Sequence, residues 1–396
     1  MPVTAESSFQ FPGKVAGQGS GGLYRVPNHF QSGVSLHSHT MFSEESLDVV
    51  PRYTAKLPYV GNAVQRMQTE HDGGRRQRLD FSQAFWTPPL SPRQAYRVEE
   101  KQIQRQFNLP ALVSLTDHDD TRAAALLRIL HRFRNAPVST EWTVPFESTF
   151  FHLGVHNLPT ESAKELQLEL AHFTSQPAPD ALTGYLRKLN SFSEVLVVLN
   201  HPLWDEKGVG TAQHRQSLMR LIAQHGRYIH ALELNGLRSW PENAEVIALA
   251  RQANFPVISG GDRHGREPNA VLNLSRASEF AAFVAEVRYE RKSHVVFMPQ
   301  YREPLRLRVL QTIVDVLRDY PENAQGRRVW SDRVFYRDPL SGSAMPFTAI
   351  WRNGAPCLVR HFIRAMQLLE WHGIRSALRL ALDDRSARWS EQQASL

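Results

Sequence analysis

Short apolar runs recur along residues 33–298, and polar or helical stretches separate them. Each run has the length of a buried β-strand, and residues 121–133, 215–226 and 243–254 carry apolar positions at helical spacing. Strands that alternate with helices predict an α/β fold with a parallel sheet, and about seven or eight such units predict closure into a barrel. The expected strands are residues 33–36, 111–115, 137–140, 150–155, 195–199, 230–234, 256–259 and 294–298.

Three segments interrupt or flank this rhythm. Residues 1–30 are rich in glycine, serine and proline, which predicts an irregular N-terminal lead-in. Residues 50–105 form a polar insertion with prolines, charge clusters and aromatic residues, which we interpret as a lid because long irregular insertions are usually functional or disordered. The repeating units therefore occupy residues 31–300, and Arg-rich amphipathic patterns in residues 301–396 predict a helical C-terminal extension.

Histidine and carboxylate residues stand at or near the C-terminal ends of six expected strands. His37 and His39 follow the first strand, and their i, i+2 spacing places both side chains on one face of an extended chain. Barrel enzymes assemble their active sites at this end of the strands. Imidazole and carboxylate ligands together suit zinc, manganese or iron, and more ligands than one ion needs predict a cluster with a bridging carboxylate. The corresponding residues of the other five strands are Asp117, His118 and Asp119; Glu141; His152; His201; and Asp262 with His264.

The composition narrows the class of protein. The net charge of +7 and the isoelectric point near 9.6 favour anionic partners, such as phosphorylated metabolites or nucleic acid, although a basic solvated surface explains them equally well. The single cysteine, Cys357, excludes a disulfide framework and a Cys-rich zinc site. We find neither a signal-peptide pattern nor an apolar run long enough to span a membrane, so a cytoplasmic protein without a membrane partner is expected.

Taken in order, the ligand-like residues form a recognisable series of motifs. The series resembles that of the polymerase and histidinol phosphatase (PHP) superfamily of metal-dependent phosphoesterases, over about residues 33–300. The resemblance implies a distorted (β/α)7 TIM-like barrel with up to three divalent ions (Zn, Mn or Fe) in a cleft, to which this chain adds a long insertion after the first strand and the helical extension. The motifs are LHSHT at 36–40, TDHDD at 116–120, Glu141 followed by His152 on the next strand, NHP at 200–202 and DRH at 262–264.

The resemblance also implies a ligand set. The first metal position would take His37, His39, Glu141 and Asp262, the second Glu141, His152 and His201, and the third His118, His264 and an acidic residue of the first loop. That loop reads SEES here, so Glu44 is the expected ligand and Glu45 the less favoured choice. Glu233 and Asn235, which end a strand on the same side, are expected to support the ligands from behind.

The implied reaction is hydrolysis of a phosphate ester by a hydroxide that bridges two metals. A phosphomonoesterase acting on a small phosphorylated metabolite or nucleotide is the expected function, with Asp262, Arg263 and His264 as catalytic residues. Arg263 is compatible with two roles, since an arginine fork binds phosphate oxygens and an arginine at a barrel rim also forms salt bridges. RRQR at 75–78 with Phe81, Phe85 and Trp86 suits either a lid over a nucleotide or an anchor for the insertion.

Two other functions stay open. A nuclease or nucleic-acid-associated phosphodiesterase would use the positive charge and the Arg-rich C-terminal region, but no nucleic-acid-binding module is recognisable. A non-catalytic, regulatory barrel would show gaps in the ligand set, and the set looks complete. The C-terminal helices either pack on the barrel or build a homo-oligomer.

Overall fold

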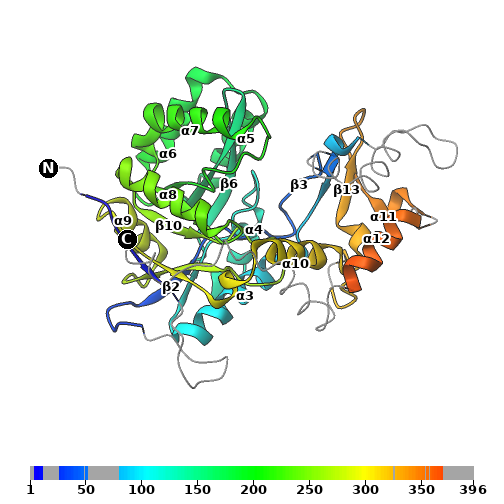
Figure 1. The fold of residues 1–396 in the computed structure, drawn as a ribbon, viewed down its shortest axis with the longest axis horizontal. Helices are drawn as coiled ribbons and strands as arrows, with labels where there is room; N and C mark the ends of the chain where they lie inside the picture. The colour runs from blue at the N-terminus through cyan, green and yellow to red at the C-terminus, as the bar shows by residue number, and fades with distance from the viewer. Residues whose placement is uncertain are drawn as a thin grey trace.

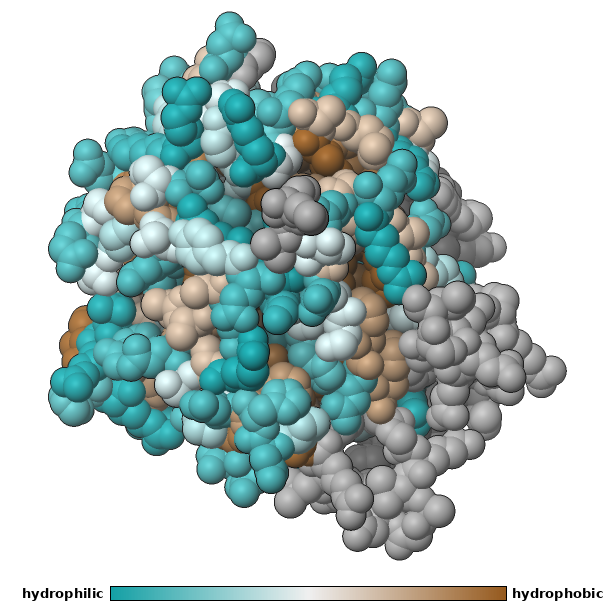
Figure 2. All heavy atoms as spheres, turned by 90° about the vertical axis from the view of Figure 1, so that its left-hand side faces the viewer, coloured by the Kyte–Doolittle hydropathy of each residue, from teal (hydrophilic) through white to brown (hydrophobic). Residues whose placement is uncertain are grey.

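The structure is a computed structural model that describes residues 4–11, 26–48, 50–51, 80–323, 326–352, 354–355 and 357–368. It is a mixed α/β protein (Figure 1). The larger lobe contains two five-stranded sheets, and the small lobe contains a four-stranded sheet. On the side of the larger lobe that Figure 2 shows, hydrophilic residues predominate and apolar residues form small, scattered patches. None of the helices within these ranges is long and apolar enough to cross a lipid bilayer.

The first sheet of the larger lobe contains strands from both ends of the expected barrel. β2 pairs with β5 in parallel, β1 pairs with β12 in parallel, and β11 is antiparallel to both of its neighbours. The prediction of an irregular N-terminal lead-in is therefore wrong for β1, which completes the sheet edge. In spatial order the strands are β1 (Glu6–Gln10), β12 (Lys292–Phe297), β11 (Val271–Ser275), β2 (Ser32–Ser35) and β5 (Ala111–Val113).

The second sheet contains the middle strands of the chain. β8, β9 and β10 are parallel, whereas β7 is antiparallel to both β6 and β8. Only Glu147 and Ser148 connect β6 to β7, and so short a connection can form only a hairpin because parallel strands need a long crossover. The prediction of a purely parallel sheet is wrong at this hairpin. In spatial order the strands are β10 (Val257–Gly260), β9 (Ala231–Asn235), β8 (Leu196–Leu199), β7 (Thr149–Leu158) and β6 (Val138–Phe146).

The two sheets meet at two isolated parallel bridges. One bridge pairs Ser38 with Arg263, just past the ends of β2 and β10, and the other pairs His118 with Glu141. The expected barrel is thus not a single closed sheet in this structure. Because both bridges involve or adjoin expected metal ligands, the place where the sheets join is also the place where the ligands gather.

Helices cover the outer faces of these sheets (Figure 1). The first, α3, begins at Pro92 with a capping box between Ser91 and Gln94. It packs against β2 so closely that a Cβ on Gly33 would lie 2.6 Å from Ile103 Cγ2. The last part of the expected insertion, residues 92–105, is therefore a helix of the larger lobe. The helices are α3 (Pro92–Phe107), α4 (Arg122–Arg128), α5 (Ala163–Ser175), α6 (Leu182–Ser191), α7 (Thr211–His225), α8 (Trp240–Gln252) and α9 (Phe280–Arg288).

The small lobe combines the insertion with the C-terminal extension. Its sheet is antiparallel, in the order β14 (Ala344–Pro346), β13 (Val334–Arg337), β4 (Ala84–Trp86) and β3 (Glu45–Ser46). The prediction of a purely helical extension is therefore wrong, although its helices α10 (Leu305–Leu317), α11 (Phe347–Ile350) and α12 (Cys357–Leu368) are present. The rings of Phe85 and Phe335 stack across β4 and β13 at 5.1 Å, and α10 lies between the two lobes (Figure 1).

Candidate metal centre

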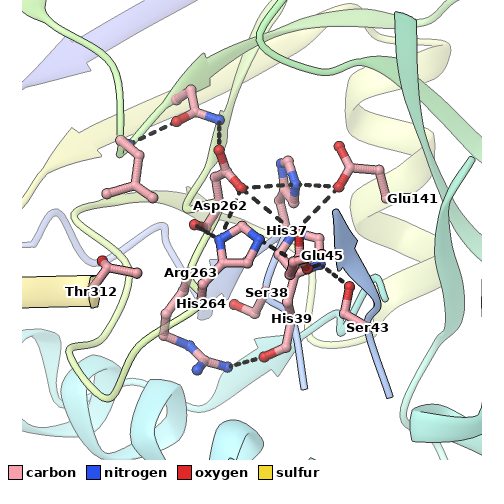
Figure 3. A network of polar contacts seen from close by, with 12 residues as sticks. His37, Ser38, His39, Ser43, Glu45, Glu141, Asp262, Arg263, His264 and Thr312 are labelled. Atoms are coloured by element: carbon pink, nitrogen blue, oxygen red, sulfur yellow. Dashed lines mark hydrogen bonds and ion pairs between the residues drawn. The ribbon is translucent and has the colours of Figure 1, made fainter. Parts of the chain in front are cut away.

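The expected ligands converge at one place in the larger lobe, and Figure 3 shows His37, His39, Glu141, Asp262 and His264 close together. Most of them follow a strand, whereas Glu141 and His152 lie within β6 and β7, which continue past the predicted strand ends. Three of them sit in the left-handed backbone region, with φ of 60° at His37, 26° at His201 and 52° at Asp262. Non-glycine residues avoid this region because it costs about 1–3 kcal/mol each, and such residues cluster at functional sites. The strand ends therefore turn sharply so that their side chains face a common point.

Glu141 lies at the middle of the cluster and is completely buried. One carboxylate oxygen is 2.9 Å from His37 Nε2, 3.3 Å from His39 Nε2 and 3.4 Å from His118 Nδ1. The other oxygen is 3.2 Å from His201 Nε2 and 3.5 Å from His152 Nδ1. Glu141 thus presents its two oxygens to two different sets of imidazoles, as a carboxylate that bridges two metal positions must.

A second carboxylate, Glu45, contacts three imidazoles. Its oxygens are 3.1 Å from His264 Nε2 and 3.3 Å from His118 Nε2, and His39 Nδ1 lies at 3.8 Å. Glu44, the expected ligand, instead forms an ion pair with Arg337 and is largely exposed. Adjacent residues of an extended chain point to opposite faces, so only one of the two glutamates can face the cluster. The choice of Glu44 over Glu45 is therefore wrong.

Glu233 supports the cluster from behind. It accepts a hydrogen bond from His37 Nδ1 at 2.5 Å and another from the backbone N–H of His201 at 2.7 Å, and Asn235 donates to it at 2.9 Å. Because Nδ1 is engaged by Glu233, Nε2 is the ring nitrogen of His37 that faces the cluster. A Cβ on Gly260 would lie 1.5 Å from Glu233 Oε1, so this approach requires glycine. Glu233 and Asn235 thus occupy the supporting positions expected from the sequence.

Arg263 does not point into the cluster. Its guanidinium donates to Glu99 at 2.9 Å and to the carbonyl oxygens of His39 and Gly265, and both charged side chains are buried. A buried arginine with these partners cannot reach a phosphate in the cleft, so the prediction of a phosphate-binding, catalytic Arg263 is wrong. The alternative salt bridge exists, but inside the protein rather than at a rim. It fastens the DRH turn to the backbone of the HSH turn.

Several residues near the cluster were missed in the sequence. Asn200 donates to Glu141 at 2.9 Å, and its place directly before His201 was the available signal. Arg238 lies over the ring of Trp204 at 3.8 Å, with its guanidinium 3.9 Å from Asp262. Arg238 and Trp204 belong to no strand-end motif, because both occupy loops whose path depends on the fold.

Opposing charges set the protonation of the cluster. Burial by itself raises the pKa of Glu141, but the positive imidazoles of His37 and His118 outweigh it and hold the pKa well below its usual range. Burial likewise raises the pKa of Glu45 and of Asp262, but the charges of His264 and His118 lower that of Glu45, and a hydrogen bond with His39 and the charge of His37 lower that of Asp262, to well below the usual range. The carboxylates are therefore ionised, which is the form that binds a cation.

The donor set fits divalent metal ions. His39 Nε2, His152 Nδ1 and Glu45 Oε1 are buried and have charged neighbours at 3.1–3.5 Å, but none of the three atoms makes a well-directed hydrogen bond to the described residues. Leaving buried polar atoms unsatisfied is costly, and a cation that accepts their lone pairs removes that cost. Three groups of ligand atoms lie within 4.8 Å of one another: His37, His39 and Glu141; His118, Glu141 and His152; and His39, Glu45, His118 and His264.

A cleft of about 780 Å³ opens beside the cluster and is lined in part by His118 and His152. Two basic side chains, Arg122 and Lys207, and two aromatic rings also line it. From the expected lid, the RRQR stretch lies outside the described residues, and Phe85 packs inside the small lobe. Trp86, however, lies beside the cluster, with its ring 5.6 Å from that of His264.

No family model and no curated protein matches this sequence. Sixteen chains of solved structures match it, including the following two. One, from Bifidobacterium adolescentis and provisionally described as a metal-dependent phosphoesterase, has 13% identity and a TM-score of 0.30, over 60% of this chain and 90% of that chain. The other, an amidohydrolase from Chromobacterium violaceum with bound sulfate and no metal, has 14% identity and a TM-score of 0.34, over 60% and 89%. The chain resembles the PHP superfamily in its ordered motifs, and functional conclusions rest on the residues of the cluster.

Proposed function

We propose that this chain is a metal-dependent hydrolase of phosphate esters, and specifically a phosphomonoesterase of a small phosphorylated metabolite or nucleotide. The observation that carries the proposal is the position of Glu141, whose two oxygens face two separate sets of imidazoles. A buried carboxylate placed in this way is suited to two ions a few ångströms apart. Paired ions of this kind serve hydrolysis of phosphate esters.

The contacts support three metal positions. The first would be held by His37, His39, Glu141 and Asp262, the second by Glu141, His152 and His201, and the third by Glu45, His118 and His264. We also propose that seven strands, β2 and β5 to β10, form a distorted ring. The bridges Ser38–Arg263 and His118–Glu141 support it, because they connect the two sheets at both ends of the series.

The residues of the chain would position the substrate and the ions. Divalent ions bound there would neutralise phosphate oxygens and lower the pKa of a water molecule that attacks phosphorus. Glu233 orients His37, and Asn200 fixes Glu141 by donating to the same oxygen that faces His201. Lys207 and Arg122 line the cleft together with six carboxylates, and Arg122 is paired with Asp120, so the bound ions would supply the positive charge that attracts a phosphorylated molecule.

Phosphate release tests the proposal. Purified protein supplied with Mn²⁺ would be offered nucleoside monophosphates, nucleoside 3′,5′-bisphosphates, histidinol phosphate, sugar phosphates and short oligonucleotides. We expect release from a phosphomonoester that disappears in Asp262→Ala, because this substitution removes a carboxylate of the first position. Glu194→Ala, an exposed carboxylate away from the cluster, should retain full release.

The outcomes separate the candidate functions. Cleavage of oligonucleotides without phosphate release from monoesters would favour a phosphodiesterase, and its nucleic-acid binding should fall steeply with salt. A metal-loaded, folded protein without any hydrolysis would overturn the proposal and leave a binding or regulatory role.

A further inference from the structure

The group formed by His39, Glu45, His118 and His264 is divided between the two lobes. The three imidazoles follow strands of the larger lobe, whereas Glu45 belongs to β3, the edge strand of the small sheet. β3 is only two residues long, and an isolated strand of that length has no stability of its own. The position of Glu45 therefore depends on the rest of the small sheet.

The register of the small sheet directs Glu45 toward the cluster. Glu45 pairs with Trp86 of β4, and Trp86 pairs with Val334 of β13. Directly paired residues of antiparallel strands share one face of the sheet. Both Glu45 and Trp86 reach His264, at 3.1 Å for the carboxylate and 5.6 Å between rings, so this face of the small sheet lies against one side of the cluster.

Residues of the C-terminal extension hold this segment at both ends. Arg327 donates to the carbonyl oxygen of Met41, two residues after His39, and to the Thr87 hydroxyl at 3.1 Å. Arg337 of β13 contacts Glu44 at 2.6 Å, directly before β3. The chain between the HSH turn and β3 is thus fastened by side chains that lie almost 290 residues away in sequence.

We propose that the small lobe is a metal-binding element, in which the C-terminal extension positions Glu45 for the third metal position. Arg327 is a positioning residue in this assignment, since it acts through the backbone of residues 41–45. The inference rests on the proposed metal centre. Its specific content is that the third ion depends on the extension, whereas the first and second positions, built from the larger lobe alone, do not.

Metal stoichiometry and affinity test this assignment on the full-length chain. Elemental analysis and calorimetric titration with Mn²⁺ would compare the wild type with Glu45→Gln, Glu44→Gln, Arg327→Ala and Arg327→Lys. We expect Glu45→Gln to lose one ion and Arg327→Ala to weaken the same ion by about tenfold or more, as loss of outer-shell support does. Arg327→Lys should recover part of the affinity, and Glu44→Gln, which removes only the charge of the ion pair with Arg337, should weaken the third ion far less than Glu45→Gln does.

Trp86 provides a second readout. Binding of the third ion should change the fluorescence of Trp86, a change that Trp86→Phe and Glu45→Gln both lack. Hydrogen exchange in β8 and β9 would show that the larger lobe of each variant is folded. If Arg327→Ala does not fold, Arg327→Lys and Arg337→Ala, which breaks the contact with Glu44, take its place and should weaken the third ion to a smaller degree.

The results distinguish this inference from the proposed function. A wild-type protein that binds fewer than two ions would overturn the metal centre itself. Full occupancy with unchanged third-ion affinity in the folded arginine variants, or equal weakening of every ion, would overturn the role of the small lobe while the metal centre stands.

Discussion

Glu233 lies 2.5 Å from Nδ1 of His37, so a buried carboxylate on β9 sets the orientation of an imidazole that follows β2. The other oxygen of Glu233 accepts the backbone N–H of His201, which follows β8. One side chain thereby aligns candidate ligands from two strands that are far apart in sequence.

Glu233→Gln should weaken metal binding without unfolding the protein. The amide retains the shape of the side chain but loses the charge that strengthens the His37 ligand, and such outer-shell changes cost about 10–100-fold in metal affinity. Titration with Mn²⁺ measures the effect, and Glu245→Gln on the exposed face of α8 is the matched control. Unchanged affinity in Glu233→Gln would show that Glu233 does not tune His37.

Gly260→Ala should disturb the same contact by steric means. The added methyl group would lie 1.5 Å from Glu233 Oε1, so Glu233 must move away from His37. Overpacking of this kind costs about 1–3 kcal/mol in the free energy of unfolding. Gly184→Ala in α6 is the control, because a Cβ there meets no atom within 4 Å, and a helical alanine should stabilise by about 0.5–1 kcal/mol. Urea denaturation of both variants measures the two changes in the free energy of unfolding, which should have opposite signs.

Arg263→Met should destabilise the protein through Glu99. Removal of the guanidinium leaves the buried Glu99 carboxylate without its charge partner, which costs about 3–5 kcal/mol in the free energy of unfolding. The double variant Glu99→Met/Arg263→Met should recover part of this loss. A stable Arg263→Met protein with a raised KM for substrate would contradict the structural role and restore a phosphate-binding one.

His230 should make stability depend on pH. Burial, assisted by Arg288 and Arg291, lowers the pKa of His230 to about 3, and its Nδ1 accepts the N–H of Val197. The folded chain holds this imidazole neutral, whereas the unfolded chain binds a proton below about pH 6.5. Stability is therefore fully present above that pH and is lost as the pH falls toward 3, by about 1.4 kcal/mol per unit.

His230→Gln removes this dependence. Urea denaturation at about pH 7 and about pH 5 should show the wild type losing its advantage over the variant as the pH falls. The exposed His131→Gln serves as the comparison. Parallel pH profiles for the wild type and His230→Gln would refute the prediction.

The ligands of the candidate centre could be predicted from the sequence where they follow predicted strands. His37 and His39 share a short motif, and Glu141, His201 and Asp262 each follow an apolar run, so the geometry of a sheet brings them together. No long-range information is needed for this step. The apolar runs locate the strands, and His37, His39, His201 and Asp262 follow them, although β6 continues past Glu141 to Phe146.

Features set by distant pairing could not be read in this way. The choice between Glu44 and Glu45 depends on the face of β3, which is set by pairing with β4 and, through it, with β13. β11 escaped notice because the polar Asn273 interrupts its apolar pattern, and only the fold reveals that Asn273 is buried and bonded to Ser259. From the sequence, Arg263 is likewise compatible with phosphate binding, and only the structure shows that Glu99 lies beside it.

The small sheet also has a consequence for biosynthesis. A nascent chain emerges from the ribosome N-terminus first, so β2, β5 to β10 and their ligands are complete long before β13 is synthesised. Until that strand arrives, β3 has only the three-residue strand β4 to pair with. The growing chain would therefore complete the proposed first and second metal positions before β13 is made, and the proposed third position only afterwards.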